Sequence, residues 1–420
     1  MHAPAPASTQ PFRLRAPEFV ALMAFTQALQ ALAIDVMLPA IGIIARDLGA
    51  GDPNDRQLIV GLFLLGAGLG SLLPGTLADR FGRRPVLLVA LACYVAMALA
   101  CALVTDFETL LALRVIQALG SGGLVVLPLT IIRDRFEGDR MARTQSLVSM
   151  IFLVVPMLAP SLGQAVLLIA GWRWIFGVMA LLGTLVAAWI ALRLPETLHP
   201  EFRQPIRIAA IASNTLAALS SRAAIGYVLG SALVMAVMWG YIQSSQQLLA
   251  EHFGAGDAYP LFFGGMALCM AAANFGNSRI VERFGARRVS HTALLAYLAV
   301  GALQVWFALR PGQTLWQFVP LMTAAMCLLG FMGANFGSIG LQPFARIAGA
   351  ASSAHAFVRM VLAAALGALL GQAYDGTARP LAAAMLAAGL GALALVLYSE
   401  HGRLFRRVLP PGAPRPVAAP

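Results

Sequence analysis

The chain has 420 residues, of which 60% are hydrophobic and only 11% are charged, and its mean hydropathy is +0.79. Soluble domains have roughly 45 to 50% apolar and 25% charged residues, so this composition excludes a water-soluble globular protein. The formal net charge of +11 comes entirely from arginine, because the chain contains no lysine. The arginines are spread along the chain instead of forming one basic domain, so we expect no nucleic-acid partner.

Twelve apolar runs of about 20 residues follow one another, separated by charged or Pro/Gly-rich breaks. Each run is long enough to cross a hydrocarbon core of roughly 30 Å, and lipid requires every backbone polar group to be satisfied internally, so membrane-spanning helices are predicted. The predicted spans are Phe19–Ile41, Gln57–Leu77, Val86–Val104, Phe107–Ile131, Thr144–Ile169, Trp174–Leu194, Ala223–Gln246, Tyr259–Ile280, Val289–Leu309, Leu315–Leu341, Ala350–Gln372 and Leu381–Tyr398.

The arginines outside these spans are distributed unequally between the two sides of the membrane. One side has most of them, in the loops after the second, fourth, sixth, eighth and tenth spans and in the tails. The other side has only Arg46, Arg56, Arg173, Arg310 and Arg379. An excess of Arg and Lys marks the cytoplasmic face, so both termini are predicted to be cytoplasmic.

The first span contains a carboxylate, Asp35, in the otherwise apolar sequence QALQALAIDVMLPAIGII. An acid at this depth costs about 2.5 to 3.5 kcal/mol on insertion-derived scales unless the protein compensates for it. It must therefore pair with a cation, remain neutral or face a water-filled cavity, and a chain that moves protons can use all three states in turn. The alternative is an Asp that caps a helix near the interface, with Pro39 marking the helix end.

The loop after the second span has the sequence GTLADRFGRRP at positions 75–85. Gly82 permits a tight turn, the arginines can bind anionic headgroups, and Asp79 can face the N-terminus of another helix. The loop resembles the G-x-L-A-D-R-x-G-R-[KR] pattern of the major facilitator superfamily. That resemblance implies a latch between two bundles in the outward-facing state, whereas the alternative is a topological anchor. The latch residues are Gly75, Asp79, Arg80, Gly82, Arg83 and Arg84.

A related turn follows the eighth span, where ERFGARR occupies positions 282–288. Six predicted crossings separate the two copies, so both face the same side, as expected for two six-helix bundles related by an axis along the membrane normal. The predicted fold is an all-α integral membrane protein with twelve transmembrane helices. Its predicted parts are an N-terminal tail (1–18), an N-terminal bundle (19–194), a linker (195–222), a C-terminal bundle (223–400) and a C-terminal tail (401–420).

Three further segments are similar to drug exporters of the Bcr/CflA type within that superfamily. They are IDVMLPAI at 34–41, LRVIQALG at 113–120, and PMLAPSLG at 156–163 followed by WRWIF at 172–176. The sequence departs from the usual pattern at Ala118, where glycine is common, and at Val36 and Met37, where the subfamily has Met-Tyr. We expect these departures to affect substrate preference more than the fold.

The fifth span resembles the helix motif associated with antiporters, which Pro156, Pro160 and Gly163 carry here. The prolines remove backbone hydrogen bonds and the glycine allows close packing, so a bend is predicted. The resemblance implies that this helix restricts proton leak.

Arg114 in the fourth span is predicted to lie at the same depth as Asp35. Asp35 lies about six residues before the outer end of its span and Arg114 about seven after the outer start of its own, which places both ~10 Å below the interface. If the helices are neighbours, as the resemblance implies, an ionised Asp35 could pair with Arg114 directly or through polar groups and water. The alternative is that Arg114 extends towards the interface and only stabilises packing.

Other polar residues within the spans could line a central cavity, because such sites combine apolar walls with a few polar groups. Interhelical hydrogen bonds are the alternative for each of them. His355 and Arg359 lie one helical turn apart and should face the same way, into protein or water. The substrate-pocket candidates are Gln27, Gln30, Gln117, Trp239, Tyr241, Asn274, Asn335, His355 and Arg359.

The predicted function is proton-coupled multidrug efflux, in which small amphipathic compounds leave across a bacterial inner membrane as protons enter. The chain lacks G-x-x-x-x-G-K-[ST], so nothing suggests ATP hydrolysis, and no cofactor or metal is expected beyond the proton gradient. The alternatives are a metabolite or amino-acid exporter or a symporter on the same fold, and a membrane sensor or embedded enzyme. The expected partners are the substrate, protons and the lipid bilayer, and the protein is expected to be a monomer and not an enzyme.

Overall fold

The computed structural model describes residues 14–136, 138–198, 201, 203, 216, 220–256 and 258–405, and no strand occurs among them. Most of the predicted tails, 1–18 and 401–420, and most of the predicted linker 195–222 fall outside these residues, and the first helix begins at Ala16, inside the predicted N-terminal tail.

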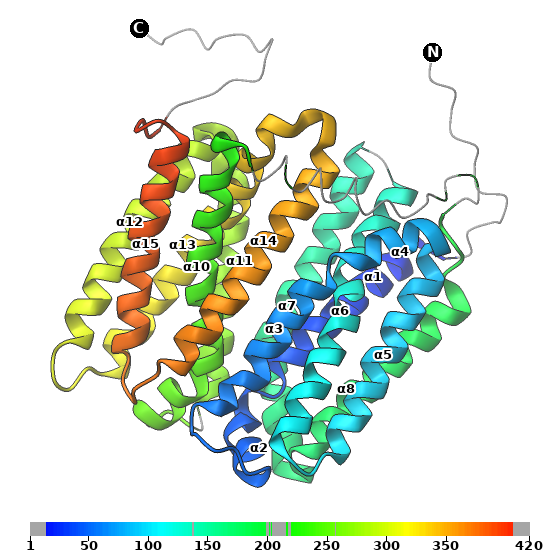
Figure 1. Ribbon diagram of the computed structural model, residues 1–420, viewed down its shortest axis with the longest axis horizontal. Coiled ribbons are helices and arrows are strands. Elements are labelled where there is room, and N and C mark those ends of the chain that lie inside the picture. Colours follow the sequence, from blue (N-terminus) through cyan, green and yellow to red (C-terminus); the bar gives the residue numbers. More distant parts are fainter. Residues whose placement is uncertain are drawn as a thin grey trace, which may run out of the picture.

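The first half of the chain contains a series of helices joined by short loops (Figure 1). They are α1 (Ala16–Asp35), a 3-10 turn (Leu38–Ala40), α2 (Ile41–Asp47), a second 3-10 turn (Asp55–Gln57), α3 (Leu58–Gly70), α4 (Leu73–Phe81), α5 (Arg83–Leu103), α6 (Phe107–Arg135), α7 (Gly138–Ala170) and α8 (Arg173–Arg193).

The second half contains six long helices and two short helical segments. They are α10 (Arg222–Gln246), a π-helical turn (Gln247–His252), α11 (Tyr259–Phe284), α12 (Ala286–Ala308), α13 (Leu315–Leu341), a 3-10 segment (Gln342–Ile347), α14 (Ala348–Gln372) and α15 (Arg379–Ser399).

These helices agree with the predicted spans, with three local differences. Among the described residues, ten helices are individually long and apolar enough to cross a membrane, and the bent pair α3 and α4 makes an eleventh span. The remaining predicted span, the fifth (Thr144–Ile169), falls on α7, whose stretch Val154–Ala170 is apolar. The chain is thus a multi-pass membrane protein.

The three differences are two interruptions and one extension, which the apolar pattern does not reveal. The second span is bent by 43° between α3 and α4, next to Pro74, whose ring has no N–H to continue the helix. The first span breaks after Asp35 and then continues through α2 to Asp47. The seventh continues past its predicted end through the π-helical turn to His252.

Each half has its own apolar core. The core of the first half is built from α1 to α8, and that of the second half from α10 to α15 together with Leu38, Val60 and Leu64 of the first half. The halves meet mainly through two helix pairs, α3 with α14 and α7 with α11 (Figure 1). Glycines permit these approaches, because a Cβ at Gly68 would lie 3.2 Å from Val361 and one at Gly264 would lie 2.9 Å from the carbonyl of Met157.

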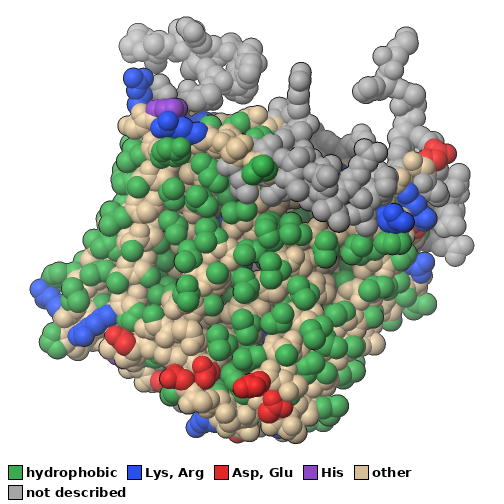
Figure 2. Space-filling model, in the orientation of Figure 1, with side chains coloured by type: hydrophobic (Ala, Val, Ile, Leu, Met, Phe, Trp, Pro, Cys, Tyr) green, Lys and Arg blue, Asp and Glu red, His purple; other side chains and the backbone are tan. Residues whose placement is uncertain are grey.

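The surface distribution of side chains agrees with a membrane environment. Hydrophobic side chains cover the middle of the face in view, and the charged side chains gather near the two ends of the helices (Figure 2). We refer to the end that holds Arg83 and Arg287 as the Arg83 end, and to the opposite end, which holds Arg56 and Glu251, as the Arg56 end.

Candidate functional site

The break in the first span occurs at Asp35. The helix α1 ends there, Val36 donates the last backbone hydrogen bond to Leu32, and a 3-10 turn containing Pro39 follows before α2 begins. The alternative in which Asp35 lies at a helix end is therefore correct for the backbone. That alternative also places Asp35 near the membrane interface, which the structure does not support. Asp35 is only 5% exposed, and the span continues for twelve residues beyond it, to Asp47.

Asp35 lies where the two halves meet. Its neighbour Ile34 packs against both apolar cores, and Leu38 belongs to the core of the second half. Asp35 is also close enough to Tyr259 of α11 for an electrostatic interaction. Among the described residues, none forms a hydrogen bond or an ion pair with the Asp35 carboxyl group. A buried carboxyl group without a fixed partner can exchange its proton without breaking an ion pair.

Arg114, in contrast, is held by several partners although it is fully buried. Its Nη2 donates to the carbonyl of Ala33 at 2.7 Å, its Nη1 donates to Oε1 of Gln117 at 2.7 Å, and its Nε is 3.5 Å from the carbonyl of Ile59. The guanidinium also lies over the ring of Phe63, 4.1 Å from its centroid. Backbone carbonyls and an aromatic face thus offset much of the cost of burying this cation.

The structure therefore brings Asp35 and Arg114 into one region without pairing them directly. Arg114 binds the carbonyl of Ala33, two residues before Asp35, and no direct ion pair joins the two side chains. The alternative in which Arg114 extends towards the interface does not describe its position, because its guanidinium is completely enclosed.

The antiporter-type motif of α7 packs against this helix break. There is no room for a Cβ at Gly163, because it would overlap the backbone carbonyl of Val36. The helix continues through both Pro156 and Pro160. The glycine therefore brings α7 against the residue that follows Asp35.

The residues predicted as a latch form a compact polar cluster at the Arg83 end. Arg83 is 3% exposed and forms ion pairs with Asp79 and with Asp134, the latter at 2.9 Å. Gly82 adopts a positive φ of 105°, and a Cβ there would collide with Glu196. Glu196 accepts hydrogen bonds from the backbone N–H groups of Arg83 and Arg84, at the N-terminus of α5.

The rest of the predicted latch lies around this cluster. Arg84 donates from Nη2 to the carbonyl of Ala191, Arg80 lies over the ring of Phe81, and Gly75 faces Val126 with space to spare. All described polar contacts of Arg83 and Arg84 remain within the first half of the chain. In this conformation no polar contact among the described residues connects the cluster to the second half.

The second copy of the turn has a similar arrangement in the second half. Gly285 also adopts a positive φ, of 85°, and Arg287 forms an ion pair with Glu400 at 2.6 Å. Glu400 also accepts a hydrogen bond from the hydroxyl of Tyr227 at 2.7 Å. Glu196 and Glu400 thus follow the last helix of their respective halves and bind the repeated turn of the same half.

At the Arg56 end, polar contacts join the two halves directly. Arg56 and Glu251 form a bidentate ion pair with distances of 2.5 and 2.8 Å. The side-chain amides of Gln57 and Gln247 are hydrogen-bonded to each other. Asn54 donates to the carbonyl of Tyr374 at 2.8 Å. The molecule is closed at this end.

The nine substrate-pocket candidates do not form one site. Gln27 donates to the carbonyl of Val125, Gln117 binds Arg114, Tyr241 donates to the sulfur of Met266, and Asn335 donates to Asn277 at 2.8 Å. Trp239 packs in the core of the second half, His355 packs edge-on against Phe344, and Gln30 is buried. For Gln27, Gln117, Tyr241 and Asn335 the structure agrees with the interhelical alternative, because each donates a hydrogen bond to a residue of another helix.

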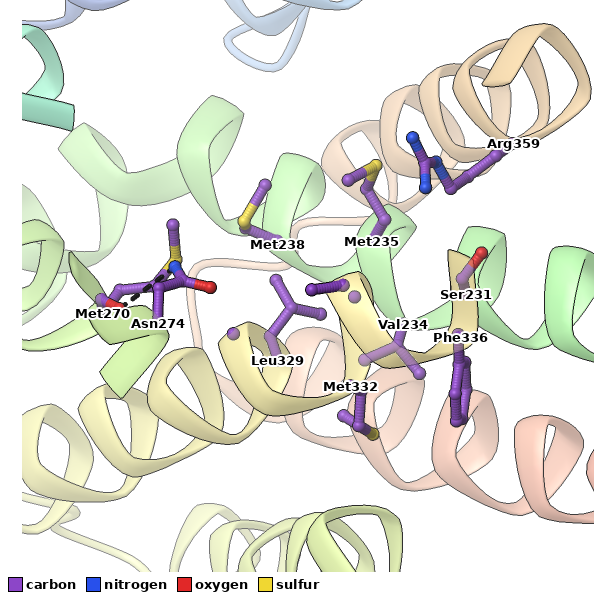
Figure 3. Close-up of a pocket in the computed structure, with 13 residues that line it drawn as sticks. Ser231, Val234, Met235, Met238, Met270, Asn274, Leu329, Met332, Phe336 and Arg359 are labelled. Carbon is purple, nitrogen blue, oxygen red and sulfur yellow. Dashed lines mark hydrogen bonds between the residues drawn. The ribbon is translucent and has the colours of Figure 1, made fainter. Parts of the chain in front are cut away.

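Asn274 and Arg359 are the two candidates that do share a cavity. It has a volume of about 160 Å³ and lies between α10, α11, α13 and α14 of the second half (Figure 3). Its walls are mainly apolar, and four methionines line it: Met235, Met238, Met270 and Met332. Within the described residues, no group of three His, Cys, Asp or Glu side chains could hold a metal ion.

Sequence reasoning missed the partners of the charged residues. Asp134, Glu196, Glu251 and Glu400 are all far along the chain from the arginines that they bind. One signal was available, since Glu196 and Glu400 occupy equivalent places after the sixth and twelfth spans. The pairing of Arg56 with Glu251 has no comparable signal; Arg56 lies in the 3-10 turn Asp55–Gln57 and Glu251 in the π-helical turn Gln247–His252.

Comparison with known proteins agrees with this architecture. The family profile described as Major Facilitator Superfamily matches residues 23–368. A bicyclomycin resistance protein homolog from Haemophilus influenzae is 27% identical over 367 residues, covering 86% of this chain and 91% of the relative. A multidrug resistance protein, MdtL, from Klebsiella pneumoniae subsp. pneumoniae is 31% identical over 324 residues, covering 76% and 80%.

Other similar proteins include an uncharacterized MFS-type transporter, YdgK, from Bacillus subtilis, which is 30% identical over 89% of this chain and 93% of its own length. Among solved structures, a peptide transporter (POT) in complex with sulfate has a TM-score of 0.72 at 16% identity, with 93% of this chain and 96% of that chain covered. That likeness concerns the fold. On the match of the family profile, the chain belongs to the Major Facilitator Superfamily of membrane transporters.

Proposed function

We propose that this transporter exports small amphipathic compounds in exchange for protons, as a drug:proton antiporter of the bacterial inner membrane with both termini in the cytoplasm. The relatives named for bicyclomycin resistance and multidrug resistance support drug export. The Met-lined cavity supports an amphipathic substrate, because methionine side chains adapt to ligands of different shape. The excess of arginine on one side of the spans supports the orientation.

The observation that carries the proposal is the position of Asp35. It is a buried carboxyl group at a break in the first span, at the junction of the two halves, and no described residue binds it. A carboxyl group used only for stability would be expected to have a hydrogen-bond donor, because leaving a buried polar group unpaired costs about 1 to 3 kcal/mol. The coupling acid of a proton exchanger instead has to be free to bind and release its proton.

In the proposed cycle the bundles 19–194 and 223–400 move relative to each other around Asp35. The conformation described here is closed at the Arg56 end and represents the state that takes substrate from the cytoplasm. Substrate binding favours release of the Asp35 proton to that side, and reprotonation from the outside favours release of substrate. Arg114 stabilises the ionised form through its positive charge, and the cluster around Arg83 closes the cytoplasmic side in the other state.

The energetics of one-proton exchange are sufficient for useful export. One proton that crosses ~100 mV contributes about 2.3 kcal/mol, and one pH unit contributes about 1.4 kcal/mol more. Together they could sustain a gradient of several hundredfold for a neutral substrate, since each 1.4 kcal/mol corresponds to a factor of about ten. Transport then needs no cofactor and no partner subunit, and we propose that the monomer is the functional unit.

The test is transport into everted membrane vesicles from cells that express the protein, with vesicles from matched non-expressing cells as the control. A panel of amphipathic antibiotics supplies the substrates, and respiration supplies the gradient. We expect uptake that stops when an ionophore removes the pH gradient and the membrane potential. Uptake that continues after the pH gradient and the membrane potential have been removed, and that requires sodium or ATP, would contradict proton exchange.

A further inference from the structure

Two arginines lie within the membrane-spanning helices away from their ends, and their surroundings differ. Arg114 is bound by two backbone carbonyls, Gln117 and the ring of Phe63. Arg359, in the middle of α14, lines the cavity of the second half and forms no hydrogen bond or ion pair with a described residue. An unpaired cation within a membrane domain is costly and usually serves a function.

The helices around Arg359 contain almost no acid that could neutralise it. No Asp or Glu occurs in α10, α13 or α14, and the single acid in α11 is Glu282, close to the end of that helix. By contrast, the α-helices of the first half contain seven acids: Glu18, Asp35, Asp47, Asp79, Glu108, Asp134 and Asp139. The cavity of the second half is therefore a positively charged site that no carboxylate of the surrounding helices offsets.

The cavity also has apolar walls and a second polar group. Met235 and Met238 lie between Arg359 and Asn274, which are at opposite ends of the close-up (Figure 3). The Nδ2 group of Asn274 donates to the carbonyl of Met270 at 3.1 Å, which leaves its Oδ1 atom without a hydrogen bond from a described residue. The site thus combines a fixed cation, an apolar wall of adaptable side chains and a free hydrogen-bond acceptor.

We propose that this cavity binds a small amphipathic organic anion, with a carboxylate at Arg359 and an apolar ring against the methionines. This inference rests on the proposed transport function and names the substrate class. The volume of about 160 Å³ suits one ring, because an engineered cavity of about 150 Å³ in another protein holds benzene. The planar guanidinium can bind a carboxylate through two parallel hydrogen bonds.

The charge of the substrate has a consequence for the energetics of the cycle. Exchange of an entering proton for a leaving anion moves more positive charge inwards than exchange for a neutral compound does. The membrane potential, which is negative inside, then drives both movements. Exchange for a singly charged cation would move no net charge when one proton is exchanged.

The test compares three probes of nearly equal size that differ in charge: 3-phenylpropanoate, 3-phenylpropanamide and 3-phenylpropylammonium. Binding to the purified full-length protein is measured by calorimetry at low ionic strength. We expect the carboxylate to bind roughly 10- to 100-fold more tightly than the amide, the range of one charge-assisted hydrogen-bonded contact, and the ammonium to bind most weakly. Equal binding of the three probes, or a preference for the ammonium, would overturn the proposal.

Two substitutions at Arg359 refine this test. Arg359→Gln should remove the preference for carboxylate over amide while retaining weak binding of both. Arg359→Lys keeps the charge but loses the planar fork, so it should retain part of the preference. A preference that persists in full in the Gln variant would assign the anion to another site. Thermal unfolding of each variant shows whether it is folded. If Arg359→Gln does not fold, the preference for carboxylate over amide in Arg359→Lys decides the test.

The glycines offer a matched pair for locating the site. A Cβ at Gly333 would meet no atom within 4 Å, and Gly333 lines the cavity, so Gly333→Leu should occupy it and weaken carboxylate binding at least tenfold. Gly265 on α11 also has open space around it but is exposed and does not line the cavity, so Gly265→Leu should bind like the wild type. Equal binding by both variants would place the anion elsewhere.

Failure of this inference can be separated from failure of the proposed function. Binding of the probes is measured without a gradient, so it does not depend on proton coupling. If the three probes bind equally while everted vesicles still show proton-driven export, the anion site is wrong and the antiporter proposal stands. If the carboxylate is preferred but no gradient drives its movement, the site stands and the antiporter proposal fails.

Discussion

Gly163 of α7 lies directly against the backbone carbonyl of Val36, the residue after the buried Asp35. The neighbouring atom is backbone and cannot rotate away, so Gly163→Ala must displace α7 or the helix break. We expect it to destabilise the protein by about 1 to 3 kcal/mol and to reduce transport. Thermal unfolding in detergent and vesicle uptake measure the two effects. The control is Gly177→Ala, where the new methyl group would make an ordinary contact of 3.4 Å with Trp174, and equal behaviour of the two variants would contradict this packing.

The ion pair between Arg56 and Glu251 should favour the conformation that is closed at the Arg56 end. Its partners are 11% and 48% exposed, so its contribution is that of a partly screened pair, about 0.5 to 1 kcal/mol. We expect Glu251→Gln to increase the ratio of open to closed molecules at this end about two- to fivefold.

Distances between spin labels at positions 50 and 255, in a protein without the native cysteines, measure that ratio. The exchanged pair Arg56→Glu with Glu251→Arg serves as the control and should restore the closed population. An unchanged distance distribution in Glu251→Gln would contradict the closing role of this ion pair.

The two acids bound to Arg83 should have separable effects. Asp79 is 41% exposed and Asp134 is 17% exposed, so removal of the Asp79 charge leaves the more buried ion pair intact. Asp79→Asn should therefore leave expression and thermal stability nearly unchanged. It should reduce turnover, because it removes a charge whose interactions differ between the two conformations. Asp134→Asn should lower stability by about 1 to 3 kcal/mol, because it removes a charged partner of a buried guanidinium. Normal turnover in a well-expressed Asp79→Asn protein would contradict the latch.

Because no direct bond joins the side chains of Asp35 and Arg114, we expect their contributions to the free energy of unfolding to be nearly independent. In the present conformation Arg114 is held by carbonyls and Gln117, so Arg114→Lys should be destabilising to the same extent with and without Asp35→Asn. We expect a coupling below about 0.5 kcal/mol in a double-mutant cycle of unfolding free energies. A coupling of several times that value would mean that the two side chains form a strong pair in the resting protein.

The number and order of the helices could be predicted from the sequence because lipid allows few alternatives to an apolar helix of about 20 residues. The repeated turn at 79–84 and 282–288 could also be predicted, since both copies contain an acid, Arg, Phe and Gly followed by paired arginines. In the structure both glycines adopt a positive φ. The bend next to Pro74 was not predicted, and the helix end at Asp35 was only an alternative, because α4 and α2 are helical on the far side of each interruption.

The composition of the candidate site was harder to predict because it depends on contacts between distant segments. Arg114 was expected to pair with Asp35 directly or through polar groups and water, or to extend towards the interface. The carbonyls of Ala33 and Ile59 bind it instead, and carbonyl groups leave no trace in the sequence. Asn274 and Arg359 were grouped with seven other polar residues, and only the folded arrangement separates these two from residues that bond between helices.

The central claim is that Asp35 carries the exchanged proton. Its most direct test uses proteoliposomes with an imposed pH gradient and compares the wild type with Asp35→Asn. Asp106→Asn is the matched control, because Asp106 lies outside the spans, where it caps α6, and asparagine caps helices about as well as aspartate.

The amide cannot lose a proton, so it resembles the neutral carboxyl group permanently. We expect Asp35→Asn to be folded and to carry substrate down its own concentration gradient, but not to concentrate it when the pH gradient is imposed. The wild type and Asp106→Asn should both do so. If Asp35→Asn concentrates substrate as well as the wild type, Asp35 is structural and the coupling group must lie elsewhere, with His355 the next residue to test.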